Sequence, residues 1–136
     1  MKHLQPTEAW EWLRAHDEDP RSRAPLFVDV RMEIECLYVG RPPGVVNIPW
    51  YEYPELQPDP PRFVAQVEAE AGDKARPILL ICRSGKRTLD AAKALEAAGF
   101  TDVAHVAHGF EGDLDGRFHR STVNGWRFEG LPWEQM

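Results

Sequence analysis

The stretch ILLICRSGKRTLDAAKALEAAGF, residues 78–100, decides the fold of this chain. It opens with an unbroken apolar run, residues 78–81, which predicts a strand buried on both faces, as in a parallel sheet covered by helices. The run ends at Cys82, and from Thr88 a helical pattern follows that ends at Gly99, the expected C′ residue. The apolar positions of this helix are Leu89, Ala92 and Leu95. A thiol therefore stands where a buried strand ends and a helix is about to begin.

The segment that follows the thiol is cationic. Arg83, Lys86 and Arg87 lie within five residues of Cys82, and loop N–H groups and the helix N-terminus add positive charge there. Gly85 allows a positive φ, which helps a short loop to turn its N–H groups inward. A free thiol has a pKa of about 8.5, and these surroundings favour the thiolate. Alternatively, Cys82 is simply the last buried residue of a core strand. A functional role is favoured because α/β folds place their sites at the carboxyl edge of a parallel sheet.

The segment CRSGKRT, residues 82–88, resembles the active-site loop of the rhodanese-like sulfurtransferases, in which the cysteine accepts a sulfane sulfur as a persulfide. Three more segments resemble motifs of that family, in the expected order. They are residues 27–31 ("DVR"), residues 40–49 ("GHIPGAxNIP"), and residues 109–111 with 125–132 ("GG…W…GLP"). The matches cover the chain from about residue 4 to residue 133. The resemblance implies a single rhodanese-like domain over residues 1–136.

The expected architecture is α/β, with about five parallel strands and helices on both faces in three layers. Pro6 and Thr7 open the first helix, with Thr7 as N-cap, and the polar residues 16–23 form a loop. Asp59 precedes two prolines at the start of another helix, which Gly72 ends. The remaining strands are expected at residues 3–4, 26–28, 45–48 and 103–106, and a short helix at residues 32–39.

Composition excludes several classes of protein. The 136 residues are 43% apolar and carry a net charge of −6, so nucleic acid is not an expected partner. No run approaches the ~20 apolar residues of a membrane span, and the N-terminus lacks the apolar stretch of a signal peptide. We therefore expect a cytoplasmic protein that does not bind membranes.

The two cysteines, Cys36 and Cys82, form neither a CxxC pair nor a metal-ligand spacing. A disulfide between them is possible, but cytosolic α/β domains rarely use one. Cys36 is expected to be a small buried or half-buried structural thiol with nothing cationic around it. His105 and His108 suggest a metal pair, but no further Cys or His stands nearby at ligand spacing. No metal site and no cofactor are predicted.

Two charged residues after the second strand are expected to support the site. The resemblance puts Asp29 at the carboxyl edge of the sheet, close to the catalytic loop, in a supporting role; alternatively it only caps the following turn. Arg31 is expected to brace the local fold through a carboxylate such as Glu33 or Glu35.

The chain departs from the family pattern in three places. Arg41 replaces a histidine and either faces solvent or adds a cation near the site. His108 replaces a glycine, and residues 112–124 form a polar insertion before the C-terminal tail. The insertion either folds over the pocket, bringing Arg117, His119 or Arg120 to the substrate, or makes a dimer contact, or is an idle loop. The aromatic residues 50–54 either line the mouth of the site or cover the core.

Two chemistries use a cysteine in such a loop. The related phosphatases need an arginine six positions after the cysteine, but here that position is Thr88, and Arg87 comes one residue earlier. The tighter loop is typical of the sulfurtransferases, which implies double displacement: Cys82 attacks the outer sulfur of an anionic donor such as thiosulfate, and a thiophile then takes the sulfur.

The residues that follow Cys82 are expected to serve this reaction. Arg83, Lys86 and Arg87 attract the anion, while Ser84 and Gly85 cradle the persulfide. The expected partners are a small anionic donor, a thiol or cyanide acceptor and, as an open possibility, a protein acceptor. The chain is either a monomer or a homodimer. An alternative is a persulfide carrier or a protein-binding module with little free turnover.

Overall fold

The computed structural model describes residues 1–18 and 23–136, and the middle of the predicted loop at 16–23 lies outside the described residues. Five parallel strands form one sheet in the order β1-β5-β4-β2-β3. They are β1 (Lys2–Leu4), β2 (Leu26–Asp29), β3 (Val46–Asn47), β4 (Ile78–Ile81) and β5 (Val103–Val106). The predicted parallel sheet is confirmed, with β4 near its centre.

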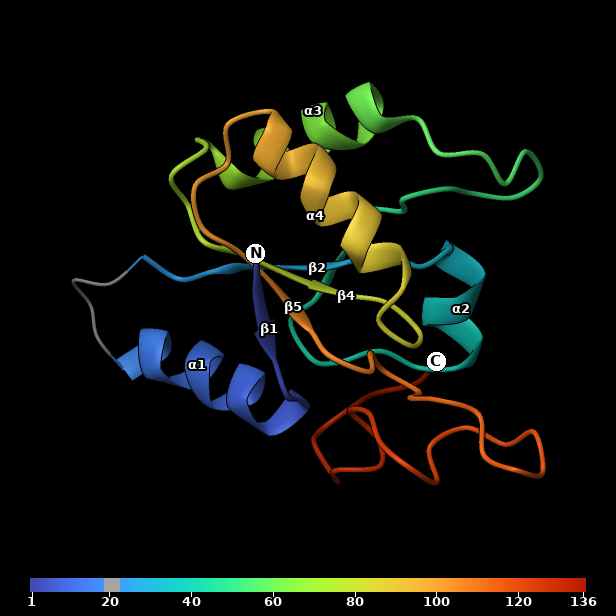
Figure 1. Cartoon of the computed structure of the whole chain (residues 1–136). Helices are drawn as coiled ribbons and strands as arrows, with labels where there is room; N and C mark the ends of the chain where they lie inside the picture. The colour runs from blue at the N-terminus through green and yellow to red at the C-terminus, as the bar shows by residue number, and fades with distance from the viewer. Residues whose placement is uncertain (19–22) are drawn as a thin grey trace.

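Helices cover both faces of the sheet (Figure 1). They are α1 (Pro6–Glu18), α2 (Glu33–Tyr38), α3 (Pro60–Ala71) and α4 (Arg87–Ala97). Figure 1 shows α3 and α4 together on one face, whereas α1 and the C-terminal segment lie on the other. The short helix α2 lies beyond the end of β2, on the side where the loop after β4 turns into α4. The three-layer α/β fold is therefore as predicted.

The apolar run in β4 supplies both layers of the core. Ile78 and Leu80 belong to the cluster under α3 and α4, while Leu79 and Ile81 belong to the cluster on the α1 side. All four side chains are fully buried, each contributing about 1.5–3 kcal/mol of transfer free energy. Because successive strand residues point to opposite faces, the apolar side chains of β4 fill both layers of the core.

Helix α4 packs one side-chain stripe against the sheet. Its buried residues are Thr88, Ala91, Ala92 and Leu95, spaced as one helical stripe. Leu89, the first apolar position named for this helix, is 36% exposed. The helix begins at Arg87, which turns the Thr88 hydroxyl toward the sheet and Leu89 away from it. The predicted end is confirmed: Gly99 follows the C-cap and has a φ of 103°.

The starts of α1 and α3 can be compared with their predicted caps. The predicted start of α3 is confirmed, and Asp59 is its N-cap, whose side chain accepts a hydrogen bond from the Arg62 N–H. Thr7 is not the N-cap of α1, because the helix already begins at Pro6 and the Thr7 hydroxyl donates to Glu129. None of the helices in the described part of the chain has the length and apolar character that a bilayer crossing requires.

Candidate active site

The Cys82 thiol lies at the carboxyl end of β4, inside the loop that leads into α4. The Gly85 N–H donates to Cys82 Sγ over 3.1 Å, and the φ of Gly85 is 94°, which confirms the inward turn predicted at this glycine. The whole Cys82 residue is only 1% exposed. The sulfur therefore lies at the base of its loop and accepts a hydrogen bond from a backbone N–H of that loop.

A second turn, residues 109–112, holds this loop from the α1 side of the sheet. The Phe110 N–H donates to the Cys82 carbonyl over 2.8 Å, and the Glu111 N–H donates to the Arg83 carbonyl over 2.9 Å. Gly109 makes the contact possible, because a Cβ there would lie 2.4 Å from the Cys82 carbonyl oxygen. The segment that resembles the family's double-glycine motif thus fixes the backbone of the loop that contains Cys82.

The three predicted cations of the loop occupy different environments. Arg83 and Lys86 are exposed. Arg87 is partly buried and donates to the Glu35 carboxylate through two hydrogen bonds, of 2.7 and 2.9 Å, with its guanidinium 5.4 Å from the centre of the Tyr51 ring. Burial alone would lower the pKa of Arg87, but the hydrogen bonds and charge of Glu35 outweigh burial and raise it. The charge of Arg87 is therefore balanced from within the protein.

Asp29 and Arg31 form a buried ion pair at the end of β2. Both side chains are fully buried, and the Arg31 guanidinium donates to the Asp29 carboxylate and to the Gly40 carbonyl over 2.7 Å. The expected pairing of Arg31 with Glu33 or Glu35 is therefore wrong. The Asp29 carboxylate also accepts a hydrogen bond from the Arg31 backbone N–H, so it stabilises the turn after β2.

A chain of hydrogen bonds, not foreseen from the sequence, starts at the thiol and runs across the sheet. Cys82 Sγ lies 3.7 Å from the Thr88 hydroxyl, which lies 2.8 Å from His105 Nδ1. His105 Nε2 in turn lies 2.7 Å from His3 Nδ1. One sequence signal was available: a threonine on the apolar stripe of a helix must find a hydrogen-bond partner, and a histidine inside a buried strand offers one.

His105 and His108 do not lie together as the pair of metal ligands that their spacing suggested. His105 is engaged by Thr88 and His3, while His108 faces Asp113 at 3.6 Å. Within residues 1–18 and 23–136 no group of three or more His, Cys, Asp or Glu side chains is arranged to hold a metal ion.

Cys36 is a structural thiol. It is 3% exposed, and both cysteines are free. Burial, followed by the charge of Asp29, raises the pKa of Cys36 to about 12, although the Arg31 charge acts in the opposite direction. The expectation that nothing cationic lies near Cys36 was therefore wrong, since Arg31 does.

The sequence left open where Arg41 and the insertion at residues 112–124 lie, and the structure shows their contacts. Arg41 pairs with Glu134. In the insertion, Asp115 accepts hydrogen bonds from the N–H groups of Arg117 and His119, so this part of the insertion is tied to itself. The Arg120 guanidinium donates to the Gly112 carbonyl.

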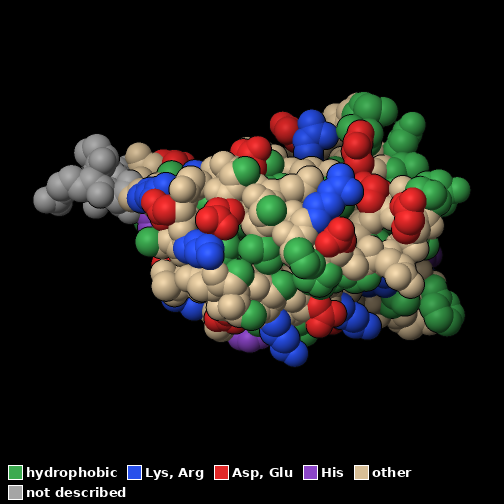
Figure 2. Space-filling model, turned by 90° about the horizontal axis from the view of Figure 1, so that it is seen from above, with side chains coloured by type: hydrophobic (Ala, Val, Ile, Leu, Met, Phe, Trp, Pro, Cys, Tyr) green, Lys and Arg blue, Asp and Glu red, His purple; other side chains and the backbone are tan. Residues whose placement is uncertain are grey.

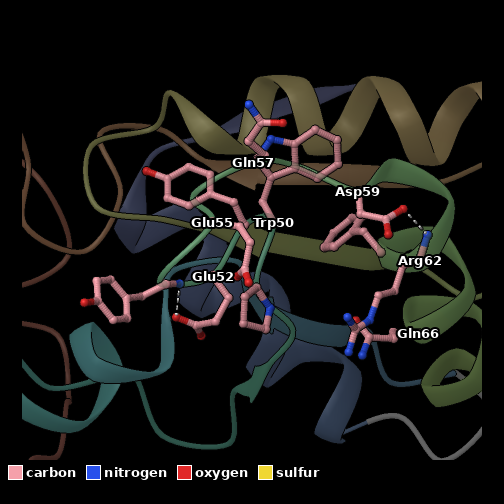
Figure 3. Close-up of a pocket in the computed structure, with 11 residues that line it drawn as sticks. Trp50, Glu52, Glu55, Gln57, Asp59, Arg62 and Gln66 are labelled. Atoms are coloured by element: carbon pink, nitrogen blue, oxygen red, sulfur yellow. Dashed lines mark hydrogen bonds between the residues drawn. The ribbon is translucent and has the colours of Figure 1, made fainter.

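The aromatic segment after β3 is divided between core and surface. Trp50 is buried against Phe63, Tyr51 packs on Arg87, and Tyr53 is 73% exposed. This segment and the start of α3 enclose a hollow of about 420 Å³ (Figure 3). Cys82 does not line this hollow, and Tyr51 contacts the loop after Cys82 through Arg87.

Comparison with known proteins agrees with this geometry. The model of the rhodanese-like domain family matches residues 9–114. The crystal structure of Rv0390 from M. tuberculosis is 34% identical and superposes with a TM-score of 0.80, over 100% of this chain and 98% of that one. A rhodanese domain-containing protein of Drosophila melanogaster, CG4456, is 34% identical over 78 residues, 57% of this chain and 70% of the relative.

More distant structures share the fold. A thiosulfate sulfurtransferase from Pseudomonas aeruginosa superposes with a TM-score of 0.69 at 20% identity, over 99% of this chain and 20% of that one. The polysulfide-sulfur transferase homodimer from Wolinella succinogenes does so with a TM-score of 0.63 at 18% identity, over 100% of this chain and 80% of that one. On the family match and the similarity to Rv0390, this chain belongs to the rhodanese-like domain family.

Proposed function

We propose that this protein is a sulfurtransferase that moves a sulfane sulfur from thiosulfate or a similar donor to a thiophilic acceptor through a persulfide on Cys82. The observation that carries the proposal is the Cys82 thiol at the end of β4, with the Gly85 N–H donating to its sulfur over 3.1 Å. A backbone N–H aimed at sulfur stabilises a thiolate and, after transfer, the inner sulfur of a persulfide. Membership of the family supports the same chemistry.

The reaction has two displacement steps. In the first, the Cys82 thiolate attacks the outer sulfur of thiosulfate; the new S–S bond forms as the old one breaks, and sulfite leaves with the bonding electron pair. In the second, cyanide or a thiolate attacks the terminal sulfur of the persulfide, and the Cys82 thiolate is released. Both steps conserve electrons without a cofactor.

The charged residues of the loop take separate roles in this proposal. Arg83 and Lys86 are exposed and attract the anionic donor. Arg87 is held by Glu35 and keeps the start of α4 in place. This pairing also argues against phosphatase chemistry, which needs an arginine fork free to bind the phosphoryl group. The two free thiols support a cytoplasmic location.

A second candidate function is that of a persulfide carrier for a protein acceptor. An apolar groove of about 660 Å³ lies between α2 and the segment after β3, and α2 also carries Glu35, which holds Arg87. Hydrophobic side chains gather at this end of the molecule (Figure 2). The most exposed of those lining the groove are Ile34, Tyr38, Tyr53 and Leu56. Glu33 and Glu52 on its rim favour an acceptor with basic residues.

Steady-state kinetics separates the two functions. The reduced protein is mixed with thiosulfate and cyanide, and thiocyanate is measured beside a Cys82→Ser variant. Many turnovers by the wild type and none by the variant support the enzyme. Slow thiocyanate release by the wild type that is absent from Cys82→Ser, with faster sulfur transfer to a thiol on a protein acceptor, supports the carrier. No thiocyanate from the wild type overturns the proposed chemistry with this donor.

A further inference from the structure

The thiol of Cys82 has a hydrogen-bond partner inside the protein, the Thr88 hydroxyl. The Cys82 residue is 1% exposed. Sulfur transfer requires its side chain to lose its proton and become a thiolate. A neighbour able to exchange a proton with Sγ is the Thr88 hydroxyl, at 3.7 Å. Thr88 is itself fully buried on α4, so its hydroxyl can pass a proton only to the next group in the chain.

That next group is His105, in the middle of the sheet. His105 Nδ1 lies 2.8 Å from the Thr88 hydroxyl oxygen, and the residue is 3% exposed. On its other side, Nε2 lies 2.7 Å from Nδ1 of His3, which stands at the same register on the edge strand β1. His3 is exposed. The chain of contacts therefore begins at the nucleophile and ends at the solvent.

Each member of this chain can both donate and accept a hydrogen bond. A hydroxyl does so by rotation, and a neutral imidazole by changing tautomer. Burial, and then the charges of His3 on β1 and His108 in the turn after β5, lower the pKa of His105 to about 4. His105 is therefore uncharged at neutral pH, which a group that relays protons in either direction requires.

We propose that Thr88, His105 and His3 form a proton path that carries the Cys82 thiol proton to solvent at the edge of the sheet and supplies a hydrogen bond to the thiolate that remains. This proposal rests on the proposed function, in which Cys82 is the nucleophile.

The transfer is balanced step by step. The S–H proton of Cys82 passes to the Thr88 oxygen while the former Thr88 hydroxyl proton passes to His105 Nδ1. The proton on His105 Nε2 passes to His3 Nδ1, and His3 releases its Nε2 proton to water. Afterwards every hydrogen bond points the other way, so that the Thr88 hydroxyl donates to the Cys82 thiolate. No electrons are transferred, and one proton leaves the protein.

Thr88→Val tests the link to sulfur, because valine keeps the shape of threonine and removes its hydroxyl. The ultraviolet absorbance of the thiolate, measured against pH with Cys82→Ser subtracted, gives the pH at which half of Cys82 is ionised. We expect this midpoint to move up by about half to one pH unit in Thr88→Val. Thr88→Ser, which keeps the hydroxyl, is expected to retain the wild-type midpoint. A Thr88→Val midpoint equal to that of the wild type would overturn the proposal.

His3→Phe tests the solvent end of the chain. It removes the partner of His105 Nε2, so the test uses the pH dependence of the rate and not only its size. We expect the rate of persulfide formation, followed by rapid quench and mass spectrometry, to fall about threefold to tenfold below neutral pH. It should return to the wild-type value at high pH, where the thiol is already ionised. A purely structural role would lower the rate equally at all pH values. Unchanged rates in His3→Phe, or a deficit that does not vary with pH, would overturn the path.

This test and that of the proposed function fail in different ways. If wild-type protein takes no sulfur from thiosulfate at saturating donor, the proposed function fails. If wild-type protein is loaded and the Thr88→Val and His3→Phe variants behave identically to it, the proton path alone is refuted.

Discussion

The carboxylate of Glu35 and the guanidinium of Arg87 join α2 to the first residue of α4 by two hydrogen bonds, of 2.7 and 2.9 Å. Their side chains are only 14% and 13% exposed. The pair holds the loop after Cys82 at its far end, while the turn at Gly109 holds it at its beginning. The loop around the thiol is therefore fixed from two sides of the sheet.

Glu35→Gln should destabilise the fold by about 1–3 kcal/mol at neutral pH, because Arg87 is left partly buried without its counter-charge. Urea unfolding measures this loss. Glu33→Gln, an exposed position on the same helix, is the control and should change stability by less than about 0.5 kcal/mol. An equal effect at both positions would contradict the account.

The same pair predicts a dependence on pH. Arg87 holds the pKa of Glu35 below its ordinary value of 4.5, although burial acts in the opposite direction. The contribution of the pair is therefore fully present above pH 4.5 and is lost as the pH falls through the lower folded-state pKa. The difference in stability between wild type and Glu35→Gln should shrink in that acidic range.

The buried His105 should cause a second loss of stability on acidification, in a higher pH range than the loss that comes from the Glu35–Arg87 pair. Its folded pKa of about 4 lies below the ordinary 6.5, so between these values the unfolded chain binds a proton that the folded protein refuses. Stability should fall by up to ~3 kcal/mol as the pH drops from 6.5 to 4. Urea unfolding at several pH values should show a flatter dependence for His105→Phe. His119→Gln, an exposed histidine, should keep the wild-type slope, and an equally steep slope in His105→Phe would refute the assignment.

Gly109→Ala should disrupt the loop that contains Cys82. Its Cβ would lie 2.4 Å from the Cys82 carbonyl oxygen, at a φ of 64°, so the backbone around the thiol must move. We expect a loss of several kcal/mol and of sulfur-transfer activity. Gly130→Ala is the matched control: its φ is 75° with nothing within 4 Å of the new Cβ, so it isolates the cost of the left-handed backbone, about 1 kcal/mol. Thermal unfolding and thiocyanate release would decide, and comparable losses in the two variants would contradict the close contact.

Replacing Arg83 and Lys86 by glutamine should raise the KM for thiosulfate about threefold to tenfold, because both exposed cations attract the anionic donor. The effect should shrink in high salt, since the charges are screened by ions. Steady-state kinetics at two salt concentrations measures both. Lys93→Gln, an exposed position further along α4, should leave the KM unchanged. A double variant with an unaltered KM would show that neither cation attracts the donor.

The sheet and the position of the thiol could be predicted because they follow from local patterns. Residues 78–81 are all apolar, which is typical of a strand that is covered on both faces. The loop after Cys82 contains the one glycine that its turn requires, and its φ of 94° is as expected. These inferences need nothing from the rest of the chain.

The pairing of charges could not be predicted, because it depends on which loops meet at the sheet edge. Arg31 binds Asp29, two residues away, and leaves Glu35 to Arg87, which is 52 residues away. Likewise, Thr88 and His105 face each other only because α4 begins at Arg87 and turns that face to the sheet. Patterns of apolar residues do not encode such distant polar contacts.

Intact mass tests the central claim, a persulfide on Cys82, most directly. Reduced protein is incubated with thiosulfate, desalted and measured, beside Cys82→Ser and Cys36→Ser. The account predicts that wild type and Cys36→Ser each gain the mass of one sulfur atom, that cyanide removes it, and that Cys82→Ser gains nothing. Unchanged wild-type mass with both thiosulfate and 3-mercaptopyruvate, or loading of Cys82→Ser, would contradict it.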